Sequence, residues 1–207
     1  MSETVKKEKV QLDPGYILKL AGILMIISAI VAALLGVVNG VTADKIAAIQ
    51  YEKQQTALQA VFPGASFTEL EVTDEILEIA GQDNAESGVA SIFASSTGGY
   101  AIEVLPTGFN GKLNVIVGVD AEGGVTGISV VSHAETAGIG TLVAADKPNK
   151  NGVGVLTQFY GRTAGSGNLF TVNSGSNQVD AISGATVTTK AITRGVNAAT
   201  LVAEHLG

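Results

Sequence analysis

The sequence of 207 residues contains no cysteine and only two histidines, His133 and His205. Without thiols the chain can form no disulfide, has no cysteine nucleophile and binds no cysteine-ligated iron–sulfur cluster. The two histidines lie far apart in the sequence, which argues against a histidine-based metal site. Any redox chemistry of this chain therefore requires an organic cofactor.

Positive charge is also scarce, and it is unevenly distributed. Residues 1–19 hold four lysines against three acidic residues, a net charge of +1. Residues 44–207 hold 8 basic against 16 acidic residues, a net charge of −8. Because nucleic-acid affinity comes largely from cationic contacts with phosphates, we expect no nucleic-acid partner.

Residues 20–43 contain no charged side chain and are mostly aliphatic. As a helix they span roughly 36 Å, enough for a hydrocarbon core of ~30 Å, so they predict one transmembrane helix. A buried helix of a soluble protein fits less well, because the run is apolar on all sides. A cleaved signal peptide is the better alternative, since residues 41–43 resemble a cleavage site, but its apolar region is usually only ~7–15 residues.

Lysine placement predicts the orientation of this helix, because Lys and Arg that flank a span stay in the cytoplasm. Four lysines precede the run, and only Lys45 and Lys53 closely follow it. We expect a cytoplasmic tail at 1–19, a helix at 20–43 in contact with membrane lipid, and an extracytoplasmic domain at 44–207. The chain would be a single-pass protein of the cell (cytoplasmic) membrane.

The region after the apolar run mixes two periodicities. Apolar residues recur at helical spacing from 46 to 61, and alternate with period two between 88 and 132. Within the second region, a turn at 120–124 joins two alternating segments, which indicates a β-hairpin. Residues 186–206 again show a helical stripe. The pattern predicts an α+β domain with a small antiparallel sheet packed by helices.

The most informative segment is Asp180-Ala-Ile-Ser183-Gly184-Ala185-Thr186. Small residues deliver a hydroxyl to the start of the predicted C-terminal helix, and little bulk surrounds Thr186. Ser, Thr and Asp favour helix caps, and a helix N-terminus attracts phosphate. From these residues alone, a helix cap beside an Asp turn is the plainer interpretation, and an attachment point for a large group is the alternative.

The same segment resembles the flavinylation motif read by the bacterial flavin transferase. In proteins with that motif, the enzyme moves FMN from FAD onto the final threonine as a phosphoester. The resemblance implies one covalent FMN on Thr186, with Ser183, Gly184 and Ala185 beside it. It also implies that the transferase recognises Asp180 during maturation.

A second block supports this resemblance. Gly108-Phe-Asn-Gly111, a strand, and His133-Ala-Glu-Thr-Ala-Gly-Ile-Gly140 occur in the order typical of FMN-binding domains. They resemble the G subunit of the Rnf electron-transport complex and the related C subunit of the sodium-translocating quinone reductase. The last block there usually reads Glu-Thr-Pro-Gly-Leu-Gly, whereas this chain has Ala137 and Ile139. The implied flavin-binding residues are Glu135, Thr136, Gly138, Ile139 and Gly140.

Several side chains near these blocks have more than one interpretation. Glu135 could hydrogen-bond the flavin or its ribityl chain, or could hold a turn, since a carboxylate accepts several hydrogen bonds. His133 fits a surface position better than a flavin-tuning role. Thr157-Gln158-Phe159 resembles a short segment of the family, and Phe159 and Tyr160 fit a hydrophobic core better than flavin stacking.

The resemblance implies a membrane-anchored electron-transfer subunit of an ion-translocating ferredoxin:NAD oxidoreductase, working beside the other subunits of that complex. It would be an electron carrier of a translocase and not a complete catalytic unit. No Gly-x-Gly-x-x-Gly motif indicates an NAD site. The alternatives are the C subunit of the quinone reductase, which is usually longer, an independent extracytoplasmic flavoprotein, and a cell-surface interaction domain without redox function.

Overall fold

The computed structural model describes residues 14–81 and 88–207. The chain divides into two units, Met1–Tyr51 and Glu52–Gly207. Most of the predicted cytoplasmic tail, residues 1–13, lies outside the described residues.

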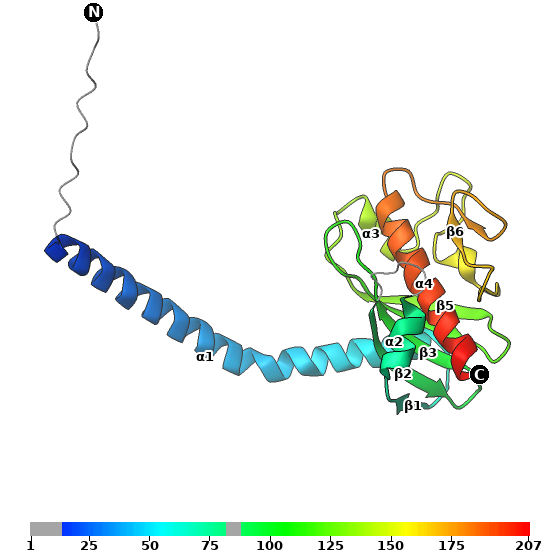
Figure 1. Cartoon of the computed structure of the whole chain (residues 1–207), viewed down its shortest axis with the longest axis horizontal. Coiled ribbons are helices and arrows are strands. Elements are labelled where there is room, and N and C mark those ends of the chain that lie inside the picture. Colours follow the sequence, from blue (N-terminus) through cyan, green and yellow to red (C-terminus); the bar gives the residue numbers. More distant parts are fainter. Residues whose placement is uncertain (1–13, 82–87) are drawn as a thin grey trace, which may run out of the picture. The chain divides into compact units, whose positions relative to one another are not determined.

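The first described element is helix α1, Pro14–Val61, which contains the whole apolar run predicted to cross a membrane (Figure 1). The helix is long and apolar enough to do so, and its most apolar segment buries nothing inside the protein. The helix predicted at 46–61 continues from it without a break. The apolar run and the start of the C-terminal domain therefore belong to one element.

The core of the second unit is a five-stranded sheet. Its strands follow one another in space as they do in sequence, and every neighbouring pair is antiparallel. The strands are β1 Phe67–Leu70, β2 Gly88–Ser95, β3 Tyr100–Leu105, β4 Asn114–Val119 and β5 Val125–Ser132. The predicted hairpin is β4–β5, in which Val117 pairs with Ile128. The α+β class and its antiparallel sheet are thus confirmed.

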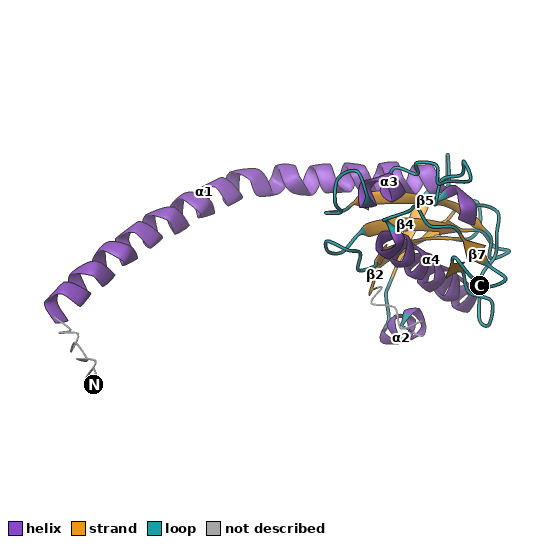
Figure 2. Ribbon diagram, turned by 90° about the horizontal axis from the view of Figure 1, so that it is seen from above, coloured by secondary structure: helices purple, strands orange, loops and turns teal. Residues whose placement is uncertain are grey.

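The two faces of the sheet are covered by different helices. Helix α4, Thr186–Leu206, packs on one face, where it meets Ile102 and Val104 of β3 in the larger core. The last turns of α1 pack on the other face, where Leu58 and Val61 meet Ala101 in a second core. In Figure 2 the strands lie between these two helices. Alternate side chains of a strand point to opposite faces of the sheet, and here a helix covers each face. The period of two predicted from the sequence therefore belongs to strands that are buried on both sides.

Glycine lets the end of α1 approach the sheet closely. A Cβ built at Gly118 would lie 2.9 Å from Cβ of Val61, and one built at Gly127 would lie 3.2 Å from Cα of Val61. Larger residues at these two positions would push the helix away from the strands. The final turns of α1 are therefore part of the domain core.

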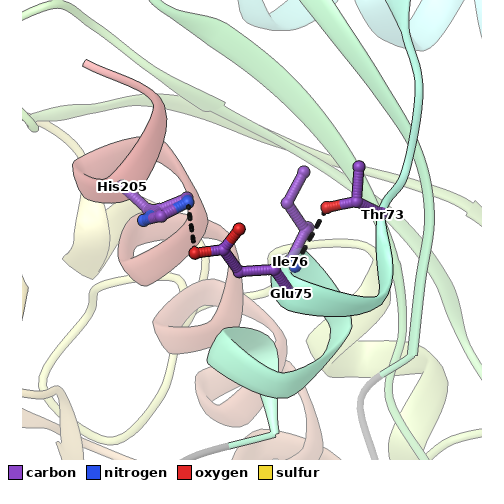
Figure 3. Close-up of polar contacts among 4 residues, drawn as sticks. All are labelled: Thr73, Glu75, Ile76 and His205. Atoms are coloured by element: carbon purple, nitrogen blue, oxygen red, sulfur yellow. Dashed lines mark hydrogen bonds and ion pairs between the residues drawn. The ribbon is translucent and has the colours of Figure 1, made fainter.

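A short helix that the sequence did not predict, α2 Asp74–Ala80, packs against α4. The hydroxyl of Thr73 caps it by accepting from the amide of Ile76 (Figure 3). Oε1 of Glu75 lies 3.7 Å from Nε2 of His205, which is in the last turn of α4. Both side chains of this ion pair are exposed, so it contributes little to stability. The cap and the apolar contacts hold α2 in place.

The loops between β5 and α4 hold the remaining short elements. These are α3 Gly140–Ala144, the 3₁₀ helix η1 Thr157–Phe159, and the parallel strands β6 Thr171–Val172 and β7 Gln178–Val179. Phe159 is fully buried and packs edge-to-face against Phe170, with ring centroids 4.9 Å apart. The interpretation of Phe159 as a core residue is confirmed, whereas the same interpretation of Tyr160 is wrong, because its side chain is 41% exposed.

The fully buried Leu58 provides a test of the second core. In the fragment that begins at Asp44, Leu58→Ala should lower the free energy of unfolding by about 2–5 kcal/mol, because it leaves a cavity between α1 and the sheet. Leu77→Ala is the matched control, since Leu77 is also a helical leucine but is exposed. Urea denaturation followed by circular dichroism measures both. Equal effects of the two substitutions would contradict packing of α1 on the sheet.

Candidate functional site

The loop that leads into α4, residues 180–186, is called the motif loop here. Gly184 has a φ of +84°, a left-handed conformation that favours glycine, and the amide of Ala185 donates to the carbonyl of Ile182. Ala185 is the N-cap of α4, and no side chain caps the helix. The interpretation of the motif as a helix cap is therefore wrong. The first N–H groups of a helix have no partner within it, so this end remains suited to an anion.

Three threonines in the first turn of α4 differ in their hydrogen bonds. The hydroxyl of Thr188 donates to Oε2 of Glu135, and that of Thr189 donates to the carbonyl of Ala185 at 3.0 Å. Both side chains are buried. Thr186 is half-buried, and within residues 14–81 and 88–207 its hydroxyl has no hydrogen bond. Of the three hydroxyls, that of Thr186 is the one left free to react.

A pocket of about 650 Å³ borders Thr186. Its walls are residues 180–184 of the motif loop, residues 148–150, Asn173 and Gln178. The volume lies within the range of cofactor sites, roughly 300–1,000 Å³. The amide side chains in its wall provide donors and acceptors for a polar ligand. This pocket is the candidate site.

Asp180 holds the motif loop against the rest of the domain. Its carboxylate accepts from Nε2 of Gln178 at 2.6 Å and from Nδ2 of Asn151 at 2.8 Å. The side-chain amide of Gln158 holds the main chain of Asp180. Its Oε1 accepts from the Asp180 N–H at 2.7 Å, and its Nε2 donates to the Asp180 carbonyl at 3.0 Å. The segment at η1 is thus tied to the motif loop. Recognition of Asp180 by a transferase stays a prediction, and the contacts described are within the protein.

Glu135 is buried and joins three separate segments. Its Oε1 accepts from the amides of Phe109 and Asn110 at 2.9 and 3.1 Å. Its Oε2 accepts from the hydroxyl of Thr188 in α4. A buried carboxylate requires such partners, because its burial without them is costly. The sequence left two roles open for Glu135, a hydrogen bond to the flavin and the holding of a turn. The contacts described are those of a residue that holds a turn.

Two glycines make room for this carboxylate. A Cβ built at Gly140 would lie 2.5 Å from Oε2 of Glu135, and one built at Gly108 would overlap Oε1. Gly138, by contrast, faces open space with a φ of +75°, and its amide donates to the hydroxyl of Thr141. Gly108, from the segment 108–111, and Gly140, from the segment 133–140, therefore leave the space that the Glu135 carboxylate occupies.

Exposed apolar side chains gather around the start of α4. Ile139 is 45% exposed, and its Cγ2 lies 4.0 Å from a Cβ built at Gly184 of the motif loop. Val187 follows Thr186 and is 48% exposed, and Phe109, on the loop held by Glu135, is 70% exposed. Ile139 thus meets the motif loop, and apolar surface is exposed beside it.

Other residues near the second block are exposed to solvent. Thr136 is exposed, and its carbonyl accepts from the amides of Ile139 and Thr141. His133 is also exposed, as predicted, and its Nδ1 accepts from the amide of Glu135 at 3.3 Å. In the described part of the chain, no group of three or more His, Cys, Asp or Glu residues is placed to hold a metal ion.

Sequence reasoning missed the wall of the pocket opposite the motif loop. Asn149, Lys150 and Asn173 lie in loops and Gln178 lies in the two-residue strand β7, where no apolar periodicity or motif marked them. The one available signal was the density of glycine and asparagine between residues 138 and 176, which indicates turns but not what they contact.

Two family models match the chain. The FMN-binding domain model matches residues 108–200, which include the Glu135 contacts and Thr186. The model of the RnfG N-terminal region matches residues 16–61, which correspond to nearly all of α1. The pocket, the free hydroxyl and the uncapped helix fit the cofactor named by the first model, and FMN is the cofactor that the domain binds.

Curated relatives match over most of their length. The chain is 34% identical to the G subunit of the Na⁺-translocating ferredoxin:NAD⁺ oxidoreductase complex of Acetobacterium woodii, covering 97% of this chain and 98% of the relative. It is 30% identical to the G subunit of an ion-translocating oxidoreductase complex of Methanosarcina acetivorans, covering 90% and 94%. With the relative from Shewanella baltica the identity is 28%, over 84% and 83%. The chain therefore belongs to the family of G subunits of the ion-translocating oxidoreductase complexes.

Proposed function

We propose that this chain is a membrane-anchored electron-transfer subunit of an ion-translocating ferredoxin:NAD oxidoreductase, with one FMN bonded through its phosphate to Thr186. The observation that carries the proposal is the hydroxyl of Thr186, which is free of hydrogen bonds in the described residues and borders the 650 Å³ pocket. The neighbouring threonine hydroxyls are used in the fold.

Attachment would be a transfer from FAD catalysed by a flavin transferase. The Thr186 oxygen forms a bond to the flavin-side phosphorus, the bond from that phosphorus to the adenylate breaks, and AMP leaves. The hydroxyl proton is released, so the product is a phosphodiester with one negative charge. The uncapped N-terminus of α4 supports this step, because free N–H groups and the helix dipole favour a phosphate there.

The small residues of the motif loop support access to this hydroxyl. Ser183 and Gly184 are exposed, and Ala185 adds only a methyl group. The apolar side chains of Ile139 and Val187 flank the loop and would contact the flavin ring, and Thr136 and Gly138 lie on the same exposed segment. Bound FMN would supply the electron transfer, and the protein would supply position and electrostatics.

The anchor supports a place in a membrane complex. We propose a cytoplasmic tail at 1–19, a span at 20–43 and an extracytoplasmic domain at 44–207, in contact with lipid and with the rest of the complex. The span has no ionisable side chain, so ion translocation would fall to other proteins of that complex. The near-complete coverage of the G-subunit relatives favours this family over the longer quinone reductase subunit. The non-redox alternative treated the motif as a helix cap, and no side chain of the motif caps α4.

The attachment site is tested by removing the hydroxyl. When the chain is coexpressed with a flavin transferase, it should gain the mass of one FMN less one water, and it should fluoresce in a denaturing gel. Thr186→Ala should abolish both signals, because no oxygen remains to form the ester, and Thr186→Ser should retain part of them. Thr68→Ala, at an exposed threonine of β1, is the control and should label fully. Covalent flavin on Thr186→Ala would refute the assignment.

The role of Glu135 is tested in the domain without flavin. Glu135→Ala should lower the free energy of unfolding by about 1–3 kcal/mol, because the amides of Phe109 and Asn110 lose their acceptor. Glu122→Ala, at an exposed carboxylate in the β4–β5 turn, should change it little. Thermal or urea unfolding measures both. If Glu135→Ala changed stability only after FMN is attached, Glu135 would be a flavin ligand and not a structural contact.

The absence of cysteine allows a clean test of topology. Single-cysteine variants Ser2→Cys and Thr68→Cys would be treated with a membrane-impermeant maleimide in intact spheroplasts. Thr68→Cys should be labelled at once, because position 68 is exposed in the outer domain, and Ser2→Cys only after lysis. The reverse pattern would place the flavin domain in the cytoplasm.

A further inference from the structure

Lys150 lies in a tight turn that faces the motif loop. The amide of Asn149 donates to the carbonyl of Val153 at 2.8 Å, and the amide of Gly152 donates to the carbonyl of Asn149 at 3.0 Å. The side chain of Asn149 also accepts from the amide of Asn151 at 2.8 Å. These bonds close the turn on itself, so the backbone of Lys150 is held in one conformation.

The residues on either side of Lys150 tie this turn to the motif loop. Nδ2 of Asn149 donates to the carbonyl of Asp180 at 3.4 Å, and Nδ2 of Asn151 donates to its Oδ2 at 2.8 Å. Lys150 stands between these two asparagines. Its position relative to the loop that carries Thr186 is therefore fixed by contacts on both sides.

Lys150 is the one cation among the described residues that line the pocket of Thr186. Its ammonium group has no ion pair, since the single ion pair in residues 14–81 and 88–207 joins His205 and Glu75. The carboxylate in the pocket wall, Asp180, accepts from Gln178 and Asn151 instead. A lysine thus borders the pocket, and no protein anion among the described residues is paired with it.

We propose that Lys150 is the counter-cation of the phosphodiester on Thr186, an inference that rests on the function proposed above. The diester carries one negative charge, and the helix N-terminus supplies only about half a positive charge in compensation. Lys150 is an exposed residue, so solvent and salt would screen part of this charge pair. A lysine suits this role because its ammonium group binds phosphate as a point charge.

The proposal makes Lys150 a positioning residue with an electrostatic signature. Reduction adds negative charge to the flavin, and a nearby cation stabilises that charge. Replacing Lys150 by a neutral residue should therefore shift the midpoint potential of the flavin to lower values. Added salt should reduce the shift, because mobile ions screen the charge.

The experiment uses the full-length chain, flavinylated in cells and purified in detergent. Lys150→Gln is compared with Lys147→Gln, which removes the same charge from an exposed lysine three residues earlier that does not line the pocket. Lys150→Arg tests rescue. The measurements are covalent FMN by mass, the ³¹P resonance of the phosphodiester, and the flavin midpoint potential at low and high salt.

Lys150→Gln should move the ³¹P resonance and lower the potential, with the potential shift shrinking at high salt, while Lys150→Arg and Lys147→Gln stay close to wild type. Loss of covalent FMN in a folded Lys150→Gln chain alone would also support the proposal, because the transfer step must bring the same negatively charged phosphate to the pocket that Lys150 borders. Equal behaviour of Lys150→Gln and Lys147→Gln in a flavinylated chain would overturn the role of Lys150 and leave the attachment site intact. A wild-type chain without covalent FMN would overturn both.

Discussion

The site depends on one buried carboxylate. Glu135 accepts from the amides of the loop at 109–110 and from Thr188 in the first turn of α4, so it joins segments 26 and 53 residues away. A buried carboxylate is tolerated only with such donors, and side chains at Gly108 and Gly140 would exclude it. Glu135 therefore joins the start of α4, the loop that presents Phe109 and the segment that presents Ile139, and the bond from Nδ2 of Asn110 to the carbonyl of Ala134 adds to this connection.

A second group of contacts fixes the motif loop from the other side. Gln158 holds the main chain of Asp180, and Asn151 holds its carboxylate. The loop is thus anchored at its first residue, while α4 begins at its last. Between these points the structure uses the hydroxyls of Thr188 and Thr189 for folding and leaves that of Thr186 unbonded among the described residues. The proposed selectivity for Thr186 among three neighbouring threonines rests on this difference in hydrogen bonding.

The sheet makes this arrangement rigid. Helix α4 is buried along most of its length on one face, and the last turns of α1 cover the other face. Thr186, the proposed attachment residue, consequently lies at the end of an element that the core holds in place, and not on a free loop. For an electron carrier this is a useful property, because the transfer of electrons depends on where the flavin is held.

The sequence alone determined the elements with strong local signals: the apolar helix, the β4–β5 hairpin, a helix beginning at Thr186, and the motif that precedes it. It missed β1, with four residues, and α2, with seven, because elements so short show too few repeats of any period. It also favoured a side-chain cap where Ala185 provides none, because cap preferences describe residue types and not the contacts they make. The contacts of Glu135, the bracing of Asp180 and the position of Lys150 in the pocket were decided only by the tertiary structure. They join residues tens of positions apart, and periodicity along the chain carries no information about such pairs.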